Sequence, residues 1–207
     1  MDTSVRDYII TYEEFEDKHR ILSIVEGHDP GACFWIQPVK CHSDKCFDWE
    51  SVEECSTAEI SLDEYEVDGL LKHFFFQFFD VTLIYNQQRK AEWSRSGREC
   101  EPANFEWNLT HNFYTYASMR QMVAEIARIA DLLENDGVYS IPAEIYLNYA
   151  PSLIDEDFPK DMPFEAQLQF IQAHISVLVD YYRRFACRIE KMLDENPEWP
   201  LISIMGP

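Results

Sequence analysis

The most regular hydrophobic pattern in the chain lies between residues 62 and 95. Apolar side chains recur there at alternating steps of four and three residues, which places them on one face of a helix. They are Val67, Leu71, Phe74, Phe78, Val81 and Tyr85. Ser61 and Glu64 precede them with the spacing of a capping box, which starts helices. The pattern predicts a helix over residues 62–95, with a strand over Phe74–Tyr85 as the alternative, because a short aromatic run fits either period.

Two further helices are predicted in the second half of the chain. One face of residues 118–135 is apolar, and the Asn-Asp-Gly sequence ending at Gly137 is typical of a helix C-terminus. A longer apolar stripe follows Pro163, a residue favoured in the first turn of a helix, and the helix is expected to end before Asn196 and Pro197. These patterns predict helices over residues 118–135 and 163–195.

The first sixty residues have weaker patterns. Residues 8–10 and 33–36 have the composition of short strands, and Thr11 begins a second capping box. Residues 105–110 alternate strictly between apolar and polar, which favours a strand. The predicted fold class is therefore mainly α, a helical bundle-like single domain over residues 1–207 with minor β-structure in the N-terminal third and near residues 105–110. Residues 1–60 are expected to form an irregular acidic α+β segment that packs on a helical core of residues 61–207.

Acidic residues greatly outnumber basic ones, with 38 Asp and Glu against 17 Lys and Arg and a formal net charge of −21. Residues 1–68 alone hold 18 acids and 5 bases. A field of this sign repels nucleic acid and anionic lipid surfaces and speeds encounter with basic proteins. The first seven residues also lack the basic and apolar regions of a secretory signal. We therefore expect a cytoplasmic protein that binds neither nucleic acid nor membranes.

Thiols and imidazoles are dense between residues 28 and 55, and both are ligands that zinc prefers. The candidate metal ligands are Cys33, Cys41, His42, Cys46 and Cys55. Structural zinc sites usually use two closely spaced cysteine pairs, whereas seven, four and eight residues separate these cysteines. Separate reduced thiols are the favoured interpretation, and no cofactor is expected. The alternative is a zinc-binding protein or enzyme that uses the Cys/His-rich region 28–55.

No motif in the chain predicts an enzyme. The sequence contains neither a Gly-x-Ser-x-Gly elbow nor a Gly-x-x-x-x-Gly-Lys loop. Cys100 lies between two glutamates, whose negative charge raises a thiol pKa and so opposes activation. A small-molecule pocket is a further alternative to ordinary core packing, and its aromatic lining would be Phe74, Phe78, Trp107 and Tyr114.

The densest acidic segment, residues 44–68, contains a single lysine and interleaved aromatic residues. Carboxylates steer a basic partner, and an aromatic side chain can anchor it. The predicted contact residues are Trp49, Glu53, Glu54, Asp63, Glu64 and Glu66. We interpret the chain as a non-catalytic binding protein for a basic protein partner, of the inhibitor or immunity-protein type. The simpler alternative is that the acidic residues only maintain solubility.

Overall fold

The computed structural model describes most of the chain outside the N-terminal segment. The described residues are 21–22, 24, 33–42, 51–63, 67–87, 91, 111–142, 150–155, 157–159 and 161–206. The strands are β1 (Ile21–Leu22), β2 (Cys33–Cys41), β3 (Val52–Glu54), β4 (Ile60–Asp63), β5 (Asn112–Thr115) and β6 (Leu201–Met205). The helical elements are η2 (Val67–Leu71), α3 (Lys72–Gln77), α5 (Tyr116–Asp136), η4 (Val138–Ser140), α6 (Ala150–Ile154), α7 (Phe164–Ala173) and α8 (Ile175–Glu195).

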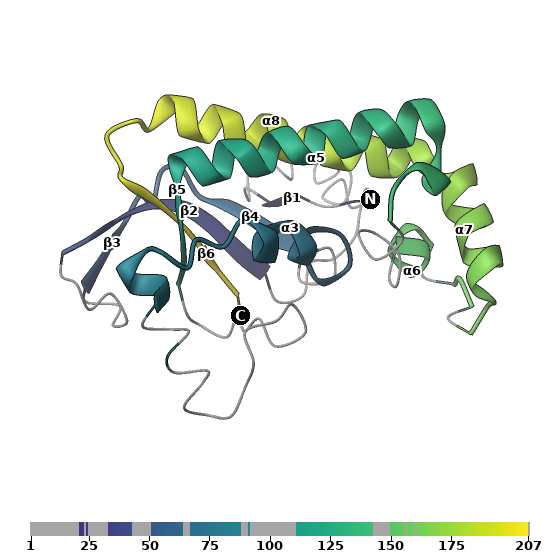
Figure 1. Cartoon of the computed structure of the whole chain (residues 1–207), viewed down its shortest axis with the longest axis horizontal. Helices are drawn as coiled ribbons and strands as arrows, with labels where there is room; N and C mark the ends of the chain where they lie inside the picture. Colours follow the sequence, from purple (N-terminus) through teal and green to yellow (C-terminus); the bar gives the residue numbers. More distant parts are fainter. Residues whose placement is uncertain are drawn as a thin grey trace, which may run out of the picture.

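The strands form one sheet in which β2 is central (Figure 1). Its strand order is β1-β4-β2-β6-β5, and β3 also pairs with β2. β1 and β4 are parallel, while every pairing of β2 and the pairing of β5 with β6 are antiparallel. β4 pairs with residues 33–36 of β2 and β3 with residues 39–41, so these two short strands follow one another along the same edge of β2.

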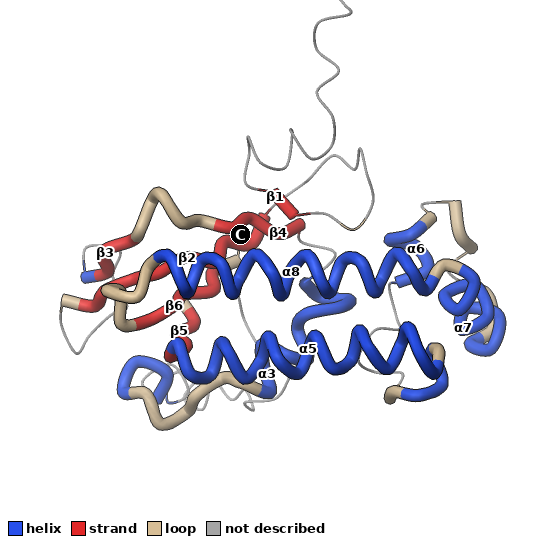
Figure 2. Tube along the Cα trace, turned by 90° about the horizontal axis from the view of Figure 1, so that it is seen from above, coloured by secondary structure: helices blue, strands red, loops and turns tan. Residues whose placement is uncertain are grey.

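The long helices α5 and α8 lie side by side across one face of this sheet, as Figure 1 and Figure 2 show from two directions. Each helix buries one apolar stripe, because residues three and four apart share a face. The stripe of α5 is Met119, Met122, Val123, Ile126, Ile129, Ala130 and Leu133. The stripe of α8 is Leu178, Val179, Tyr181, Tyr182, Phe185, Ala186, Ile189, Met192 and Leu193.

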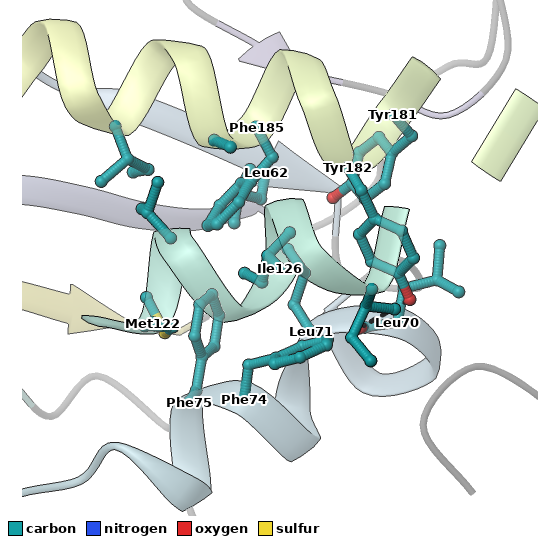
Figure 3. Packing of buried hydrophobic residues seen from close by; sticks show 14 of the residues in the cluster. Leu62, Leu70, Leu71, Phe74, Phe75, Met122, Ile126, Tyr181, Tyr182 and Phe185 are labelled. Carbon is teal, nitrogen blue, oxygen red and sulfur yellow. Dashed lines mark hydrogen bonds between the residues drawn. The ribbon is translucent and has the colours of Figure 1, made fainter. Parts of the chain in front are cut away.

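The main core fills the space between the sheet, the helix pair and α3 (Figure 3). Phe75 of α3 packs against Phe185 of α8, with the ring centroids 6.1 Å apart. The hydroxyl of the buried Tyr114 donates to the carbonyl of Phe75 at 2.7 Å, and that of Tyr182 donates to the carbonyl of Leu70 at 3.3 Å. These bonds satisfy polar groups that would otherwise weaken an aromatic core.

The opposite face of the sheet carries a smaller apolar cluster. It consists of Val39, Val52, Phe113 and Leu201, with Cys41, Leu83 and Tyr85 packed against it. Beside this cluster, the buried side chain of Asn86 binds the outer edge of β5. Its amide nitrogen donates to the carbonyl of Phe113 at 2.7 Å, and its amide oxygen accepts from the Phe113 backbone N–H at 3.2 Å.

The prediction of a mainly α, bundle-like fold is wrong. Helical residues make up 56% and strand residues 21% of the described part of the chain, which makes the fold mixed α and β rather than a bundle. The sheet supplies one wall of the core through residues such as Leu62, Ile202 and Ile204. The pattern missed it because β4 and β6 are short, and their pairings join residues far apart in the sequence.

The predicted helix over residues 62–95 is also wrong in its extent. Ser61 does not cap a helix, because it lies within β4. The described helical residues here are η2 and α3, which end at Gln77, and separately residues 84–87 and residue 91. Asp80 then accepts hydrogen bonds from the backbone N–H and hydroxyl of Thr82, at 2.8 and 2.6 Å. Such a side-chain turn competes with continuation of the helix.

Other predictions agree with the structure. α5 covers residues 116–136 and ends before Gly137, as its pattern predicted. Residues 33–36 lie in β2, and α8 ends at Glu195, directly before Asn196 and Pro197. The helix predicted over residues 163–195 is divided in two at His174, whose ring nitrogen Nδ1 lies 2.9 Å from the carbonyl of Phe170. The strands predicted at residues 8–10 and 105–110 lie outside the described residues. Among the described helices, none is both long and apolar enough to cross a membrane.

Candidate partner-binding surface

Four described acidic residues of segment 1–68 come from β3, β4 and the loop between them. They are Glu53, Glu54, Glu59 and Asp63. Successive residues of a strand point to opposite faces, so neighbours in this segment have different surroundings. Glu53 is exposed, Glu54 and Glu59 are half-buried, and Asp63 is buried.

Glu53 has the most accessible carboxylate of this segment. It lies opposite Lys40 in the pairing of β2 with β3, and its Oε2 is 3.2 Å from Nε2 of His42. The ammonium group of Lys40 also lies over the ring of Trp199, 4.3 Å from the ring centroid. Exposed pairs of this kind are weak, so the carboxylate can exchange its neighbours for a cation on a partner.

Glu54 faces the other side of the sheet and belongs to a polar group there. Its Oε1 lies 3.8 Å from Nε2 of His111, and Nδ1 of His111 is 2.7 Å from the hydroxyl of Ser203. Burial is the main cause that raises the pKa of Glu54, and the nearby charge of Glu59 adds to it, while a hydrogen bond with Gln37 lowers it. The carboxyl group therefore takes up a proton more readily than an exposed glutamate does.

These three residue types also occur in Ser-His-acid catalytic triads, but their placement here does not suit catalysis. Ser203 has no exposed surface and lies in β6 between Gln37 of β2 and Phe113 of β5. A nucleophile must reach a substrate atom, and this hydroxyl is enclosed by the sheet and its neighbours. The close contact within the group is the hydrogen bond between His111 and Ser203, which pairs two buried polar side chains of the sheet.

The structure places only some of the predicted contact residues on the surface. Glu53 is exposed, whereas Glu54 faces His111 and Asp63 is fully buried in β4. A buried carboxylate cannot meet a partner, so Asp63 leaves the proposed contact set. Trp49, Glu64 and Glu66 lie outside the described residues, and their role in binding stays a prediction.

The candidate zinc ligands are not gathered around one point. Cys33 and Cys41 lie at the two ends of β2, which at about 3.3 Å per residue places them roughly 26 Å apart. Ligands of one zinc ion each lie within about 2.3 Å of it, so these two thiols cannot share an ion. Among the described residues, no group of three His, Cys, Asp or Glu side chains is placed to hold a metal.

The remaining members of that set have other surroundings. The buried thiol of Cys55 donates to the side-chain oxygen of Asn196 at 3.7 Å, and His42 faces Glu53. Cys46 lies outside the described residues. A zinc site that uses Cys46 with a subset of the others stays a prediction, but a site built from all five residues is excluded by the separation of Cys33 and Cys41.

The aromatic pocket considered from the sequence is part of the core where the structure describes it. Phe74 and Tyr114 are buried, and Phe78 packs against the same main core. Trp107 lies outside the described residues. These three side chains therefore contribute to packing of the main core.

An open pocket of ≈ 370 Å³ lies between the β3–β4 loop and the last turns of α8. It is lined by Thr57, Ala58, Glu59, Ile60, Arg188, Lys191, Met192, Glu195 and Asn196. Two carboxylates and two cations balance each other in this lining, so the pocket itself does not select for positive charge. This pocket was not predicted from the sequence. The sequence feature that corresponds to it is the polar face of α8 at positions 188, 191 and 195.

The end of α8 beside this pocket is held by several hydrogen bonds. The Tyr116 hydroxyl donates to the backbone carbonyl of Asn196 at 2.6 Å, and the Asn196 side chain donates to the carbonyl of Met192 at 2.8 Å. Burial, together with the negative charge of Glu198, raises the pKa of Tyr116 to about 12. The phenol therefore keeps its proton at neutral pH and remains a donor.

Charge is distributed unequally between the helix pair and the rest of the molecule. α5 contains four acidic and two basic residues and α8 four of each, so the pair carries only −2 of the net charge of −21. Most of its arginines are matched, as Arg120 with Asp194 at 2.6 Å and Arg184 with Asp180 at 2.8 Å show. The acidic excess, −19, therefore lies outside the two long helices.

Comparison of the chain with protein-family models, with curated proteins and with solved structures finds no significant match.

Proposed function

We propose that the protein is a cytoplasmic, non-catalytic binding protein that engages a basic protein partner. The observation that carries this proposal is the segregation of charge. Five of the eight carboxylates of the helix pair form ion pairs with arginines on the same two helices, whereas residues 1–68 carry 18 acids against 5 bases. A segment of one sign in a chain whose long helices are nearly neutral favours a directional field toward an approaching protein.

This field determines which partners can approach. Nucleic acid and anionic membranes are repelled, while a basic protein is attracted and oriented before contact. Solubility alone requires only net charge, and it does not require the charges to concentrate in one segment of the chain. The proposed contact region comprises Glu53 and Glu59, together with Trp49, Glu64 and Glu66 from the predicted set.

Affinity capture from a lysate of the native source, washed at low and at high salt, tests the proposal. The captured partner is purified, and its affinity is measured for a variant with the substitutions Glu53→Gln, Glu59→Gln, Glu64→Gln and Glu66→Gln. We expect the affinity to fall tenfold or more, which is about 1.4 kcal/mol, and the salt dependence to become weaker.

The matched control removes the same amount of negative charge from the helix pair. It carries Asp131→Asn, Glu134→Gln, Asp180→Asn and Asp194→Asn. This control should bind almost as the unmodified protein does, because the position of the charge matters rather than its total. If the two variants lose affinity equally, the acidic region acts only through the net charge of the protein. If neither variant loses affinity, the proposal is rejected.

A further inference from the structure

Three large apolar side chains are exposed together at the end of the molecule where α7 lies. They are Tyr139 (62% exposed), Met162 (38%) and Phe164 (56%), and we call them the α7 patch. η4 and α7 are held together here, since the Tyr139 hydroxyl donates to Oε1 of Glu165 at 2.8 Å and the Val138 N–H donates to Gln172 at 2.9 Å. Figure 1 and Figure 2 both place α7 at the end of the helix pair away from β3 and β6.

The α7 patch continues an apolar stripe of α7 beyond the core. Leu168 and Ile171 are buried, and Phe164 precedes them by four and seven residues, which places all three on one helical face. Leu168 is the last buried residue of this stripe, and Phe164, one turn earlier in the helix, is exposed at the surface. Exposed aromatic area of this kind is costly in water, and where it is surrounded by polar residues it marks a surface that a partner covers.

Most charged residues near the α7 patch in the sequence are acidic, and the one basic residue of segment 136–170, Lys160, lies outside the described residues. Asp136, Asp155, Asp157, Asp161 and Glu165 are all exposed. The described residues of segments 136–142, 150–155, 157–159 and 161–170 include no lysine or arginine. An apolar centre with a rim of carboxylates matches an apolar side chain that is flanked by cations.

We propose that the α7 patch binds a segment of a basic protein in which an aromatic or large aliphatic side chain lies between lysines or arginines. The apolar side chain packs against Phe164 and Tyr139, and the cations meet the carboxylates of the rim. The inference rests on the proposed function in one respect, the basic character of the partner. It adds a second contact region, at the α7 end of the molecule.

Charge also disfavours the other occupants that could cover the α7 patch. Residues 1–20 of the same chain hold six acids and three bases, so this segment is repelled by the acidic rim. A second copy would bring another rim of carboxylates and a further net charge of −21. Only a cationic partner gains from both the apolar centre and the rim.

Two synthetic peptides of equal length and equal positive charge test the inference, one alternating lysine with tryptophan and the other alternating lysine with glycine. Their affinities for the full chain are measured by isothermal titration calorimetry, and the binding surface is mapped by amide chemical shifts. The lysine–tryptophan peptide should bind at least tenfold more tightly and should shift resonances around Tyr139 and Phe164.

The variants Phe164→Ser and Tyr139→Ser should each remove most of that advantage and leave the weak binding of the lysine–glycine peptide unchanged. Val81→Ser is the matched control, because Val81 is 41% exposed and lies outside the α7 patch, and it should have no effect. Circular dichroism establishes that each variant keeps its helical content.

Four results would overturn the inference. Equal affinities of the two peptides, or chemical shift changes confined to residues remote from α7, would show that the α7 patch does not contribute to peptide binding. In either case the peptides would bind through charge alone, and the proposed function would stand. If neither peptide binds, the proposed function loses its support as well. A concentration-dependent dimer in sedimentation that Phe164→Ser abolishes would identify the occupant as a second copy.

Discussion

The neighbouring residues Glu53 and Glu54 show how the strand geometry separates two identical side chains. Glu53 is exposed near His42, while Glu54 faces His111 on the opposite side of β3. The prediction from the sequence placed Glu53 and Glu54 on one contact surface, because composition and charge do not reveal which face of a short strand is buried. That information came from the pairing of β3 with β2, which involves residues more than ten positions away.

The raised pKa of Glu54 predicts a specific pH dependence. Because burial and Glu59 favour its protonated form in the folded state, its contribution to stability is present below its ordinary pKa of 4.5 and is lost as the pH rises through the raised value. The difference in unfolding free energy between the unmodified protein and Glu54→Gln should therefore fall with rising pH across this window. Denaturant unfolding at a series of pH values measures this difference.

Glu134 provides a control of opposite sign for that experiment. Hydrogen bonding to Arg183 lowers the pKa of Glu134, so its contribution is present above pH 4.5 and is lost as the pH falls. The corresponding difference for Glu134→Gln should rise with pH. If the differences for both variants had the same slope, the assignment of causes to Glu54 would be contradicted.

At the scale of elements, the end of α5 depends on the conformation of Gly137. This residue has φ 80° and ψ −178°, a region that only glycine adopts readily. A Cβ atom added here would also lie 2.6 Å from Oε1 of Gln172, whose oxygen accepts the Val138 N–H. The residue therefore joins α5 to η4 and brings η4 against α7.

Gly137→Ala should lower the unfolding free energy by about 1–3 kcal/mol, from backbone strain together with displacement of Gln172. Chemical denaturation measures the change. The double variant Gly137→Ala with Gln172→Ala separates the two causes, because it removes the clash and keeps the strain. A Gly137→Ala protein as stable as the original would show that the chain after α5 adapts without cost.

The elements that the sequence predicted correctly are those whose pattern is local and long. α5 repeats its apolar stripe over about six turns and ends at a glycine, so its position follows from the chain alone. β6, in contrast, is a run of five buried residues that pairs with Trp35–Val39 of β2 more than 160 positions earlier. A short apolar run does not indicate which strand it pairs with, so the sheet could not be predicted from the sequence.

The candidate surfaces were predictable to different degrees. The acidic excess of residues 1–68 is a property of composition and was visible in the sequence. The exposure of Phe164 was not, because its spacing from Leu168 and Ile171 is that of a core residue. Where the core ends along a helix depends on which elements pack against it, and no local pattern records that.

At the scale of the whole molecule, the net charge of −21 should make stability increase with salt. Repulsion between the excess carboxylates acts over long distances, and the screening length falls from about 30 Å at 0.01 M to about 8 Å at 0.15 M ionic strength. We expect the melting temperature to rise by roughly 2–4 °C in sodium chloride over this range, the change that about 1 kcal/mol produces in a chain of this size. A fall would mean that the ion pairs of α5 and α8 outweigh the repulsion.

The side chain of Asn86 has a consequence for how copies of this protein meet in a crowded solution. Among the described strands, β5 is the last on its side of the sheet, and an open strand edge is a template on which further chains can add and grow into fibrils. Asn86 occupies the outward N–H and C=O of Phe113, and the Ser118 hydroxyl donates to the carbonyl of Thr115. The outermost described strand thus offers a neighbouring molecule few groups to pair with, because one amide side chain already binds both backbone groups of Phe113.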